Sequence, residues 1–228
     1  MRNLSILACA LGIGLLAVHV QAGIIPVPNP SFESPSTDVY VGGIPDWTTS
    51  GGRDVGVCPV GVSGGAGGSM STVPDGNQYA YTLCDRGNWS PTDIQSAVLG
   101  QIQAGDTYTL NVSVGTLGNK KDTAIGTVLI RLLGADTQDG AYAELASQAI
   151  TPPAKDAWDS TQPLVYTAPA GDAGKYFKIS LYWEYSGGNY QDSGIEWDNV
   201  QLISVPEPVT LAMLAVGGLA VLRRRRAA

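Results

Sequence analysis

Apolar and polar residues alternate along several short runs of this chain, and β-branched or aromatic residues are frequent in them. Alternation of this kind puts one row of side chains in a core and the other in solvent, which is typical of β-strands. The pattern predicts strands at residues 78–83, 107–114, 126–133, 164–167, 176–182 and 195–203. Residues 141–150 come closest to a helical periodicity, and we predict a strand there too.

Turn-forming residues separate these runs. Residues 74–76 read Pro-Asp-Gly, residues 118–119 read Gly-Asn and residues 187–189 read Gly-Gly-Asn. Proline presets φ, glycine allows positive φ, and Asn or Asp bonds its own backbone, so each combination favours a turn. Short strands joined by such turns predict an all-β domain, either a jelly-roll or an immunoglobulin-like β-sandwich.

The first 22 residues have the three parts of a secretory signal peptide. Arg2 supplies a positive charge, residues 4–18 are apolar, and Val20-Gln21-Ala22 ends in the small residue that a cleavage site needs. We therefore predict a signal peptide at residues 1–22, export by the Sec machinery, and a mature chain that begins at Gly23.

The last 24 residues, 205–228, form a second address signal. Its parts are Val205, Pro206, Glu207 and Pro208, an uncharged run at 209–222, and then Arg223, Arg224, Arg225 and Arg226. A helix over the run would span about 21 Å, which is short against a bilayer core of about 30 Å. Arginines stay on the cytoplasmic side. We predict a transmembrane helix at 209–222 with an outward-facing domain, in preference to a helix of the soluble core.

This three-part tail resembles a PEP-CTERM sorting signal. The resemblance implies that an exosortase recognises the tail in the inner membrane and cuts it near residues 206–208. The anchor would then be transient, and the domain would be released to the cell surface or the extracellular matrix.

Between the two signals, residues 23–204 are long enough for one domain with a substantial core. This segment holds 8 basic and 19 acidic residues, so its net charge is −11. A binder of phosphate needs a concentrated basic face. Nucleic acid and anionic membrane surfaces are therefore excluded as partners, whereas cations and neutral polymers fit.

The cysteine count agrees with export. Cys9 lies in the signal peptide, which leaves Cys58 and Cys84 as a pair in an oxidising compartment. We predict a disulfide between them, which would restrict the glycine-rich segment that they enclose; two free thiols are the alternative.

Histidine usage restricts the chemistry of the mature chain. The one histidine, His19, is lost with the signal peptide. A chain without histidine cannot build a Ser-His-Asp or Cys-His nucleophile or a His-containing zinc site. Carboxylate-only glycosidase chemistry survives, because Glu33, Glu144, Glu184, Glu196 and many aspartates are present. We predict that the protein is not an enzyme.

Five segments resemble a galactose-binding-like jelly roll, the layout of several carbohydrate-binding modules. They are Asn29 to Glu33, Trp47, residues 75–81, residues 104–110 and residues 197–202. The resemblance favours the jelly roll over the immunoglobulin-like sandwich, and it implies a structural calcium ion held by Glu33 and Asp198. The alternative makes these two residues ordinary turn and edge positions.

Aromatic residues provide the candidate ligand surface. We expect Trp47, Trp197, Tyr79, Tyr108 and Phe177 to be core residues. A second set lies in or beside turn-rich sequence next to amides and carboxylates, where flat rings suit the faces of sugars. The predicted carbohydrate-binding residues are Trp89, Trp183, Tyr185 and Tyr190.

Together these features predict an exported, noncatalytic surface or matrix protein that associates with exopolysaccharide. Two alternatives stay open. One is a self-associating structural component of the matrix without a sugar site, and the other is a carboxylate-based enzyme that degrades polysaccharide.

Overall fold

The computed structural model describes residues 22–51, 54–62, 69–84, 91–117, 126–185 and 193–207. Gly23–Ser204 form one compact unit. The signal peptide up to residue 21, the apolar run at 209–222, the arginine cluster, Trp89 and Tyr190 lie outside the described residues. No helix in the described ranges is long and apolar enough to cross a membrane.

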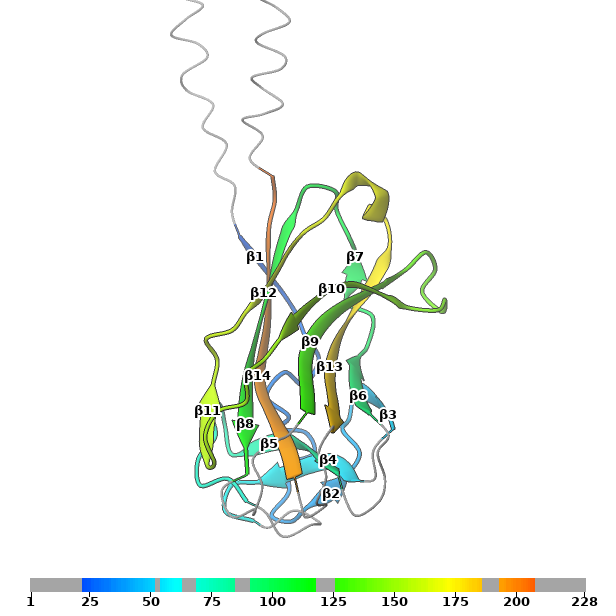
Figure 1. Ribbon diagram of the computed structural model, residues 1–228. Coiled ribbons are helices and arrows are strands. Elements are labelled where there is room, and N and C mark those ends of the chain that lie inside the picture. The colour runs from blue at the N-terminus through cyan, green and yellow to red at the C-terminus, as the bar shows by residue number, and fades with distance from the viewer. Residues whose placement is uncertain are drawn as a thin grey trace, which may run out of the picture. The chain divides into compact units, whose positions relative to one another are not determined.

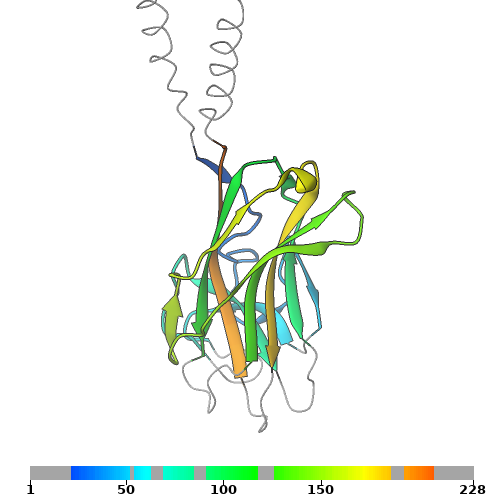
Figure 2. The same cartoon turned by 45° about the horizontal axis from the view of Figure 1, so that its top comes forward.

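The described residues form two antiparallel sheets that face each other (Figures 1 and 2). Sheet A runs in the order β11-β8-β14-β5-β4-β2, with β1 also paired to β14 and β12 to β8. Sheet B runs in the order β10-β9-β13-β6-β3, with β7 also paired to β13. This architecture confirms the predicted all-β sandwich.

The strand bounds follow the alternation of the sequence. The elements are β1 (Gly23–Ile25), β2 (Val41–Gly42), β3 (Trp47–Ser50), β4 (Asp54–Pro59), β5 (Gln78–Cys84), β6 (Thr92–Ser96), β7 (Gly100–Gln101), β8 (Thr107–Thr116), β9 (Gly126–Ala135), β10 (Ala143–Ala149), β11 (Ala157–Asp159), β12 (Leu164–Thr167), a short 3-10 helix (Ala170–Asp172), β13 (Tyr176–Tyr185) and β14 (Ser193–Val205). Each of the seven predicted runs holds one strand, namely β5, β8, β9, β10, β12, β13 and β14.

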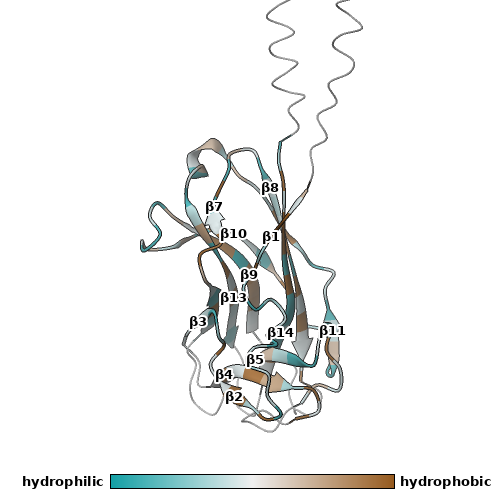
Figure 3. Cartoon of the chain, turned by 180° about the vertical axis from the view of Figure 1, so that it is seen from behind, coloured by the Kyte–Doolittle hydropathy of each residue, from teal (hydrophilic) through white to brown (hydrophobic). Residues whose placement is uncertain are grey.

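The main core lies between the sheets, where the inward residues of each strand meet. Trp47, Tyr108, Phe177 and Trp197 belong to it, as expected. Phe32 packs on Trp47 with ring centroids 5.4 Å apart. Apolar and polar residues alternate along the strands in the hydropathy view (Figure 3), because each strand turns one row of side chains inward.

A second apolar cluster lies on the outer face of sheet A. It consists of Cys58, Met70, Tyr79, Tyr81, Leu83 and Leu117. Tyr79 was expected to be core and is fully buried, although in this cluster and not between the sheets. The outer face of sheet A is therefore covered, which is unusual for an antiparallel sheet of a small sandwich.

The predicted disulfide between Cys58 and Cys84 is wrong. The thiol of Cys58 is free and buried. Cys58 lies opposite Tyr79 in the pairing of β4 with β5, and Cys84 is five residues further along β5. Five residues of a strand cover about 16 Å, whereas a disulfide needs Cα atoms within about 7 Å.

Candidate functional site

Strand β14 alternates between the two faces of sheet A. Ile195 and Trp197 enter the main core, so Glu196 and Asp198 point to the outer face. Both carboxyl side chains are fully buried there. Two buried acids on one strand are rare, because an ionised carboxylate away from water needs partners.

Few hydrogen bonds or charges compensate for the burial of the Glu196 carboxyl group. In the part of the chain that the structure describes, neither of its oxygen atoms has a hydrogen-bond partner of ordinary geometry. Within the described part of the chain, no basic side chain forms an ion pair with it. Burial raises the pKa of Glu196 well above its ordinary value, and the nearby backbone N–H groups of Glu196 and Leu117 offset this only in part. The raised pKa favours the protonated, uncharged form of this side chain.

The surroundings of Glu196 are aromatic and aliphatic. Tyr81 lies opposite it on β5, and Tyr79 and Cys58 are close enough to feel its charge. The Tyr81 hydroxyl, like the Glu196 carboxyl, is buried and has no hydrogen-bond partner within the described ranges. Burial raises the pKa of the Tyr79 hydroxyl and of the Cys58 thiol, so both stay protonated. The acid thus sits in a medium of low polarity.

Gly194 lies beside the Glu196 carboxyl, where there is little room for a side chain. A Cβ atom at Gly194 would lie 2.6 Å from Leu83 Cδ2 and 3.0 Å from Glu196 Oε1. Such contacts are too short for any side chain. The glycine therefore leaves the carboxyl room that an alanine would take.

A second group of acids lies further along the same face. The Oδ2 atom of Asp198 accepts a hydrogen bond from Asp75 N at 2.9 Å, and Ser31 Oγ donates to Asp75 Oδ2 at 2.5 Å. The Oε1 atom of Glu33 accepts from the backbone N–H groups of residues 77 and 78, each at 2.7 Å. The loop at 75–78 thus joins the first segment of the domain to the last strand.

Burial raises the pKa of Asp198 to about 7, with the charges of Asp75 and Glu33 contributing further. Calcium prefers carboxylate and carbonyl oxygens, so these donors are of the right chemical kind. In the described ranges, however, no three His, Cys, Asp or Glu side chains are arranged to hold a metal ion. Calcium binding by Glu33 and Asp198 stays a prediction, and any ion would draw carbonyl ligands or shift Asp75.

Two of the predicted carbohydrate-binding residues are not at the surface. Trp183 is 2 % exposed and Tyr185 is 7 % exposed, and both belong to the main core. Inward residues of β13 alternate with outward ones, and both residues fall in the inward row. They offer no stacking surface to a sugar. The other two, Trp89 and Tyr190, lie outside the described residues.

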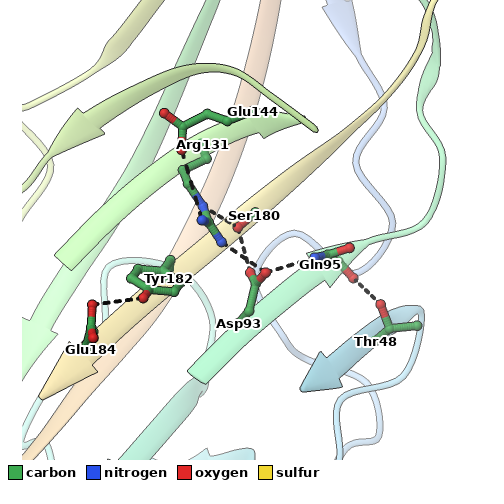
Figure 4. A network of polar contacts seen from close by, with 8 residues as sticks. All are labelled: Thr48, Asp93, Gln95, Arg131, Glu144, Ser180, Tyr182 and Glu184. Carbon is green, nitrogen blue, oxygen red and sulfur yellow. Dashed lines mark hydrogen bonds and ion pairs between the residues drawn. The ribbon is translucent and has the colours of Figure 1, made fainter. Parts of the chain in front are cut away.

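The outer face of sheet B carries a polar network (Figure 4). Arg131 Nη2 lies 2.9 Å from Asp93 Oδ2, and Arg131 Nε donates to Ser180 Oγ at 2.9 Å. Ser180 Oγ in turn donates to Asp93 Oδ1 at 2.6 Å. The guanidinium carbon of Arg131 stands 4.2 Å from the centroid of the Tyr182 ring. In this network Arg131 and Asp93 each have a partner of opposite charge, which indicates a role in stabilising the sheet.

In the sequence, Glu196 is one of several carboxylates that could take part in acid chemistry. The signal that could have singled it out is its place between Ile195 and Trp197, because an acid on a strand with two buried neighbours must face the opposite side. What the alternation could not show is that this opposite side is covered.

The fold and the buried acid define a β-sandwich protein with a candidate site on an outer sheet face. Residues 24–203 match the family model described as HpiC1-like, HpiC1 cyclase. The chain belongs to this family. The prediction that the protein is not an enzyme is therefore corrected, because the family is one of cyclases. The absence of histidine excludes only histidine-dependent mechanisms, and it leaves carboxylate chemistry available to the mature chain.

Solved structures of similar fold include two cyclases from Fischerella. A Stig cyclase, Fisc from Fischerella sp. TAU in complex with (3Z)-3-(1-methyl-2-pyrrolidinylidene)-3H-indole, is 22% identical, with a TM-score of 0.63 over 82% of this chain and 100% of its own. An apo cyclase from Fischerella sp. is 23% identical, with a TM-score of 0.62 over 82% and 98%.

A carbohydrate-binding module, TmCBM61 in complex with beta-1,4-galactotriose, is more distant. It is 15% identical, with a TM-score of 0.47 over 77% of this chain and 95% of its own. No inference follows from a likeness at this level. No curated protein matches the chain.

Proposed function

We propose that this protein is an exported enzyme of the HpiC1-like cyclase family in which Glu196 is the acid that starts ring closure. One observation carries the proposal: the Glu196 carboxyl is fully buried among aromatic side chains, and among the described residues neither of its oxygens has a hydrogen-bond partner of ordinary geometry. A protein retains such a costly group mainly where function requires it.

The reaction is an isomerisation. The O–H bond of Glu196 breaks while a C–H bond forms on a carbon–carbon double bond of the substrate, which becomes a carbocation. A second double bond of the same molecule attacks this cation, and a C–C bond closes the ring. Loss of a proton to the Glu196 carboxylate restores both the double bond and the acid. Atoms and electrons balance without an oxidant or reductant.

The buried surroundings of Glu196, which include Cys58, Tyr79, Tyr81 and Leu83 and which we call the Glu196 compartment, suit these steps. Low polarity keeps the carboxyl protonated, and its conjugate base would then stabilise the cation by charge. The rings of Tyr79 and Tyr81 border the acid, and aromatic faces attract cations. The apolar walls favour an unsaturated, water-poor substrate. An indole is our first candidate, because the Fischerella cyclase structures contain indole ligands.

We also propose that the enzyme is exported from the cell. The signal peptide at 1–22 and the tail at 205–228 support secretion, transient anchoring in the inner membrane and release by an exosortase. The enzyme would then act at the cell surface or in the matrix. Association with exopolysaccharide through Trp89 and Tyr190 stays a prediction, for which the described residues offer no additional support.

Indole itself provides a test that needs no knowledge of the natural substrate. In deuterated water, an acid that protonates C3 of indole exchanges the C3 hydrogen for deuterium, which proton NMR follows directly. We expect the purified protein to accelerate this exchange and the Glu196→Gln variant to lose at least about a hundredfold of the acceleration, the usual contribution of a general acid.

Glu184→Gln is the matched control, because Glu184 is an exposed carboxylate on sheet B. It should exchange indole at the rate of the unchanged protein. Retained exchange in a folded Glu196→Gln variant would overturn the assignment of Glu196. No acceleration by the unchanged protein would exclude indole as the substrate class.

A further inference from the structure

The Glu196 compartment is closed in the structure. Glu196 has no exposed surface, and the cluster beside it, Tyr79, Tyr81, Leu83 and Cys58 among others, is buried as well. A substrate can reach the carboxyl only if part of the cover moves. Among the described residues, four half-buried side chains pack on this cluster from outside, namely Tyr40, Val62, Val73 and Trp158.

Trp158 is the largest of these four. It belongs to β11, a three-residue strand at the edge of sheet A that pairs with the end of β8 (Figures 1 and 2). Its ring lies flat over Gly115, where a Cβ atom would come within 2.9 Å of Trp158 Cε3. The same ring meets Tyr79 edge to face, with centroids 6.1 Å apart. Trp158 is thus half-exposed to solvent on one side and contacts Tyr79 of the Glu196 compartment on the other.

Two side-chain hydrogen bonds tie this edge strand to the neighbouring segment 69–73. Trp158 Nε1 donates to the backbone carbonyl of Thr72 at 2.8 Å, and Asp156 Oδ1 accepts from Ser71 N at 2.7 Å. Both bonds are exposed to solvent. The same edge is also held by its three ladder residues and by a hydrogen bond of 2.8 Å from Asp156 N to Thr116 O. A short edge element of this kind can open without unfolding the sandwich.

We propose that Trp158 is the access residue of the Glu196 compartment, and that β11 and segment 69–73 part there to admit an aromatic substrate. This inference rests on the proposed function of Glu196. On opening, the Trp158–Thr72 and Asp156–Ser71 bonds break while the pairing of β8 with β12 and β14 stays intact. A planar substrate would then take over the edge-to-face contact of Trp158 with Tyr79.

The reactivity of the buried Cys58 thiol measures the opening of the Glu196 compartment without requiring catalysis. It lies in the enclosed cluster, where its Sγ donates to Val62 O at 3.2 Å. Its reaction with iodoacetamide therefore requires that the cover opens. Mass spectrometry of the peptide that contains Cys58 gives the labelling rate and separates it from Cys84.

Trp158→Phe keeps an aromatic ring but removes the N–H donor and part of the indole surface, and Asp156→Ala removes the second bond. We expect each variant to label Cys58 about fivefold faster, which corresponds to the loss of one hydrogen bond from the closed state. Thr161→Val is the matched control. It removes a hydrogen bond of 2.7 Å to Asp159 Oδ1 in the turn after the same strand, without touching segment 69–73. Its labelling rate should not change.

Two results would overturn the proposal. One is an unchanged labelling rate in both variants, and the other is a rise that matches their loss of global stability in urea. Saturating indole should slow the labelling of the unchanged protein, and faster labelling would also count against the proposal. If Glu196→Gln still exchanges indole, the proposed function fails while the labelling rates still decide whether Trp158 controls access.

Discussion

The buried ionisable residues on the outer faces of the two sheets differ in their partners. On sheet B, Arg131 and Asp93 are each 16% exposed, and they contact each other, Ser180 and Tyr182. On sheet A, Glu196 is completely buried, and its oxygens have no hydrogen-bond partner of ordinary geometry among the described residues. Buried charges that are fully paired are typical of structural networks, whereas an isolated buried acid is a candidate for function. The contrast separates the part of the surface that stabilises the fold from the part that we assign to catalysis.

Breaking the sheet B network should have the largest effect. Arg131→Met leaves Asp93 mostly buried without its cation, and we expect a loss of about 3 kcal/mol in the free energy of unfolding. Urea titration followed by circular dichroism measures it. The double variant Arg131→Met and Asp93→Leu should recover part of the loss, because no unpaired charge remains. An Arg131→Met protein as stable as the unchanged one would show that the network is not structural.

Calcium should have the next largest effect, through the acids beside Glu196. At a concentration about a hundred times its dissociation constant, calcium would add about 2.7 kcal/mol of stability. Chelation with EDTA should then lower Tm by roughly 5–10 °C. Asp198→Asn should abolish the response, whereas the exposed Glu184→Gln should keep it. An unchanged Tm on chelation would contradict calcium binding.

Asp198 also predicts a pH dependence of stability in the calcium-free protein. Its pKa rises from 3.8 in the unfolded chain to about 7 in the fold, so the folded state binds more protons in this range. Stability should therefore fall as the pH rises from about 4 to about 7 and level off above. Urea titrations across this range measure the fall, which Asp198→Asn should reduce. A rise of stability over the same range would contradict the assigned direction.

Removing the ionisable group of Glu196 should stabilise the protein. Glu196→Gln no longer has an ionisable group in an apolar compartment, and we expect a gain of about 1 kcal/mol at pH 7. The raised pKa of Glu196 means that the gain is larger at pH 7 than at pH 4, since the unfolded carboxylate is ionised only at the higher pH. A clear loss of stability at pH 7 would show that the carboxyl is structural.

Two tyrosine variants, one on each sheet, should show the smallest difference in the free energy of unfolding. Tyr182 donates to Glu184 Oε2 at 3.0 Å on sheet B, and Tyr81 has a buried hydroxyl without a partner on sheet A. Tyr182→Phe should cost about 0.5 kcal/mol, whereas Tyr81→Phe should cost nothing or stabilise slightly. Equal losses in urea titrations would remove this distinction between the two faces.

Most of the fold could be predicted from the sequence, because alternation and turn residues act locally. Runs such as 107–114 and 176–182 match β8 and β13 to within a few residues. The strands β3, β4 and β6 were missed, since they are short and mix threonine, aspartate and glycine with few apolar residues. Their pairing with neighbours compensates for their weak intrinsic preference.

The candidate site could be predicted only in part. Alternation assigns Glu196 to the face opposite Trp197, but a sheet face can be open to water or covered. Segment 69–73, which lies 123 to 127 positions before Glu196 in the chain, helps to cover this face. The same limit explains Trp183, which stands beside a turn-rich segment yet points into the main core.

By itself the sequence determined the all-β class, the aromatic core and the absence of histidine from residues 23–204, because these depend on residue type and on spacing within single strands. Only the tertiary structure decided that Cys58 and Cys84 are far apart, that Asp75 reaches Asp198, and that Glu196 is sealed beneath an aromatic cover. These properties depend on the register of paired strands and on which distant segments meet. Such long-range contacts have no period in the sequence, so no pattern along the chain could reveal them.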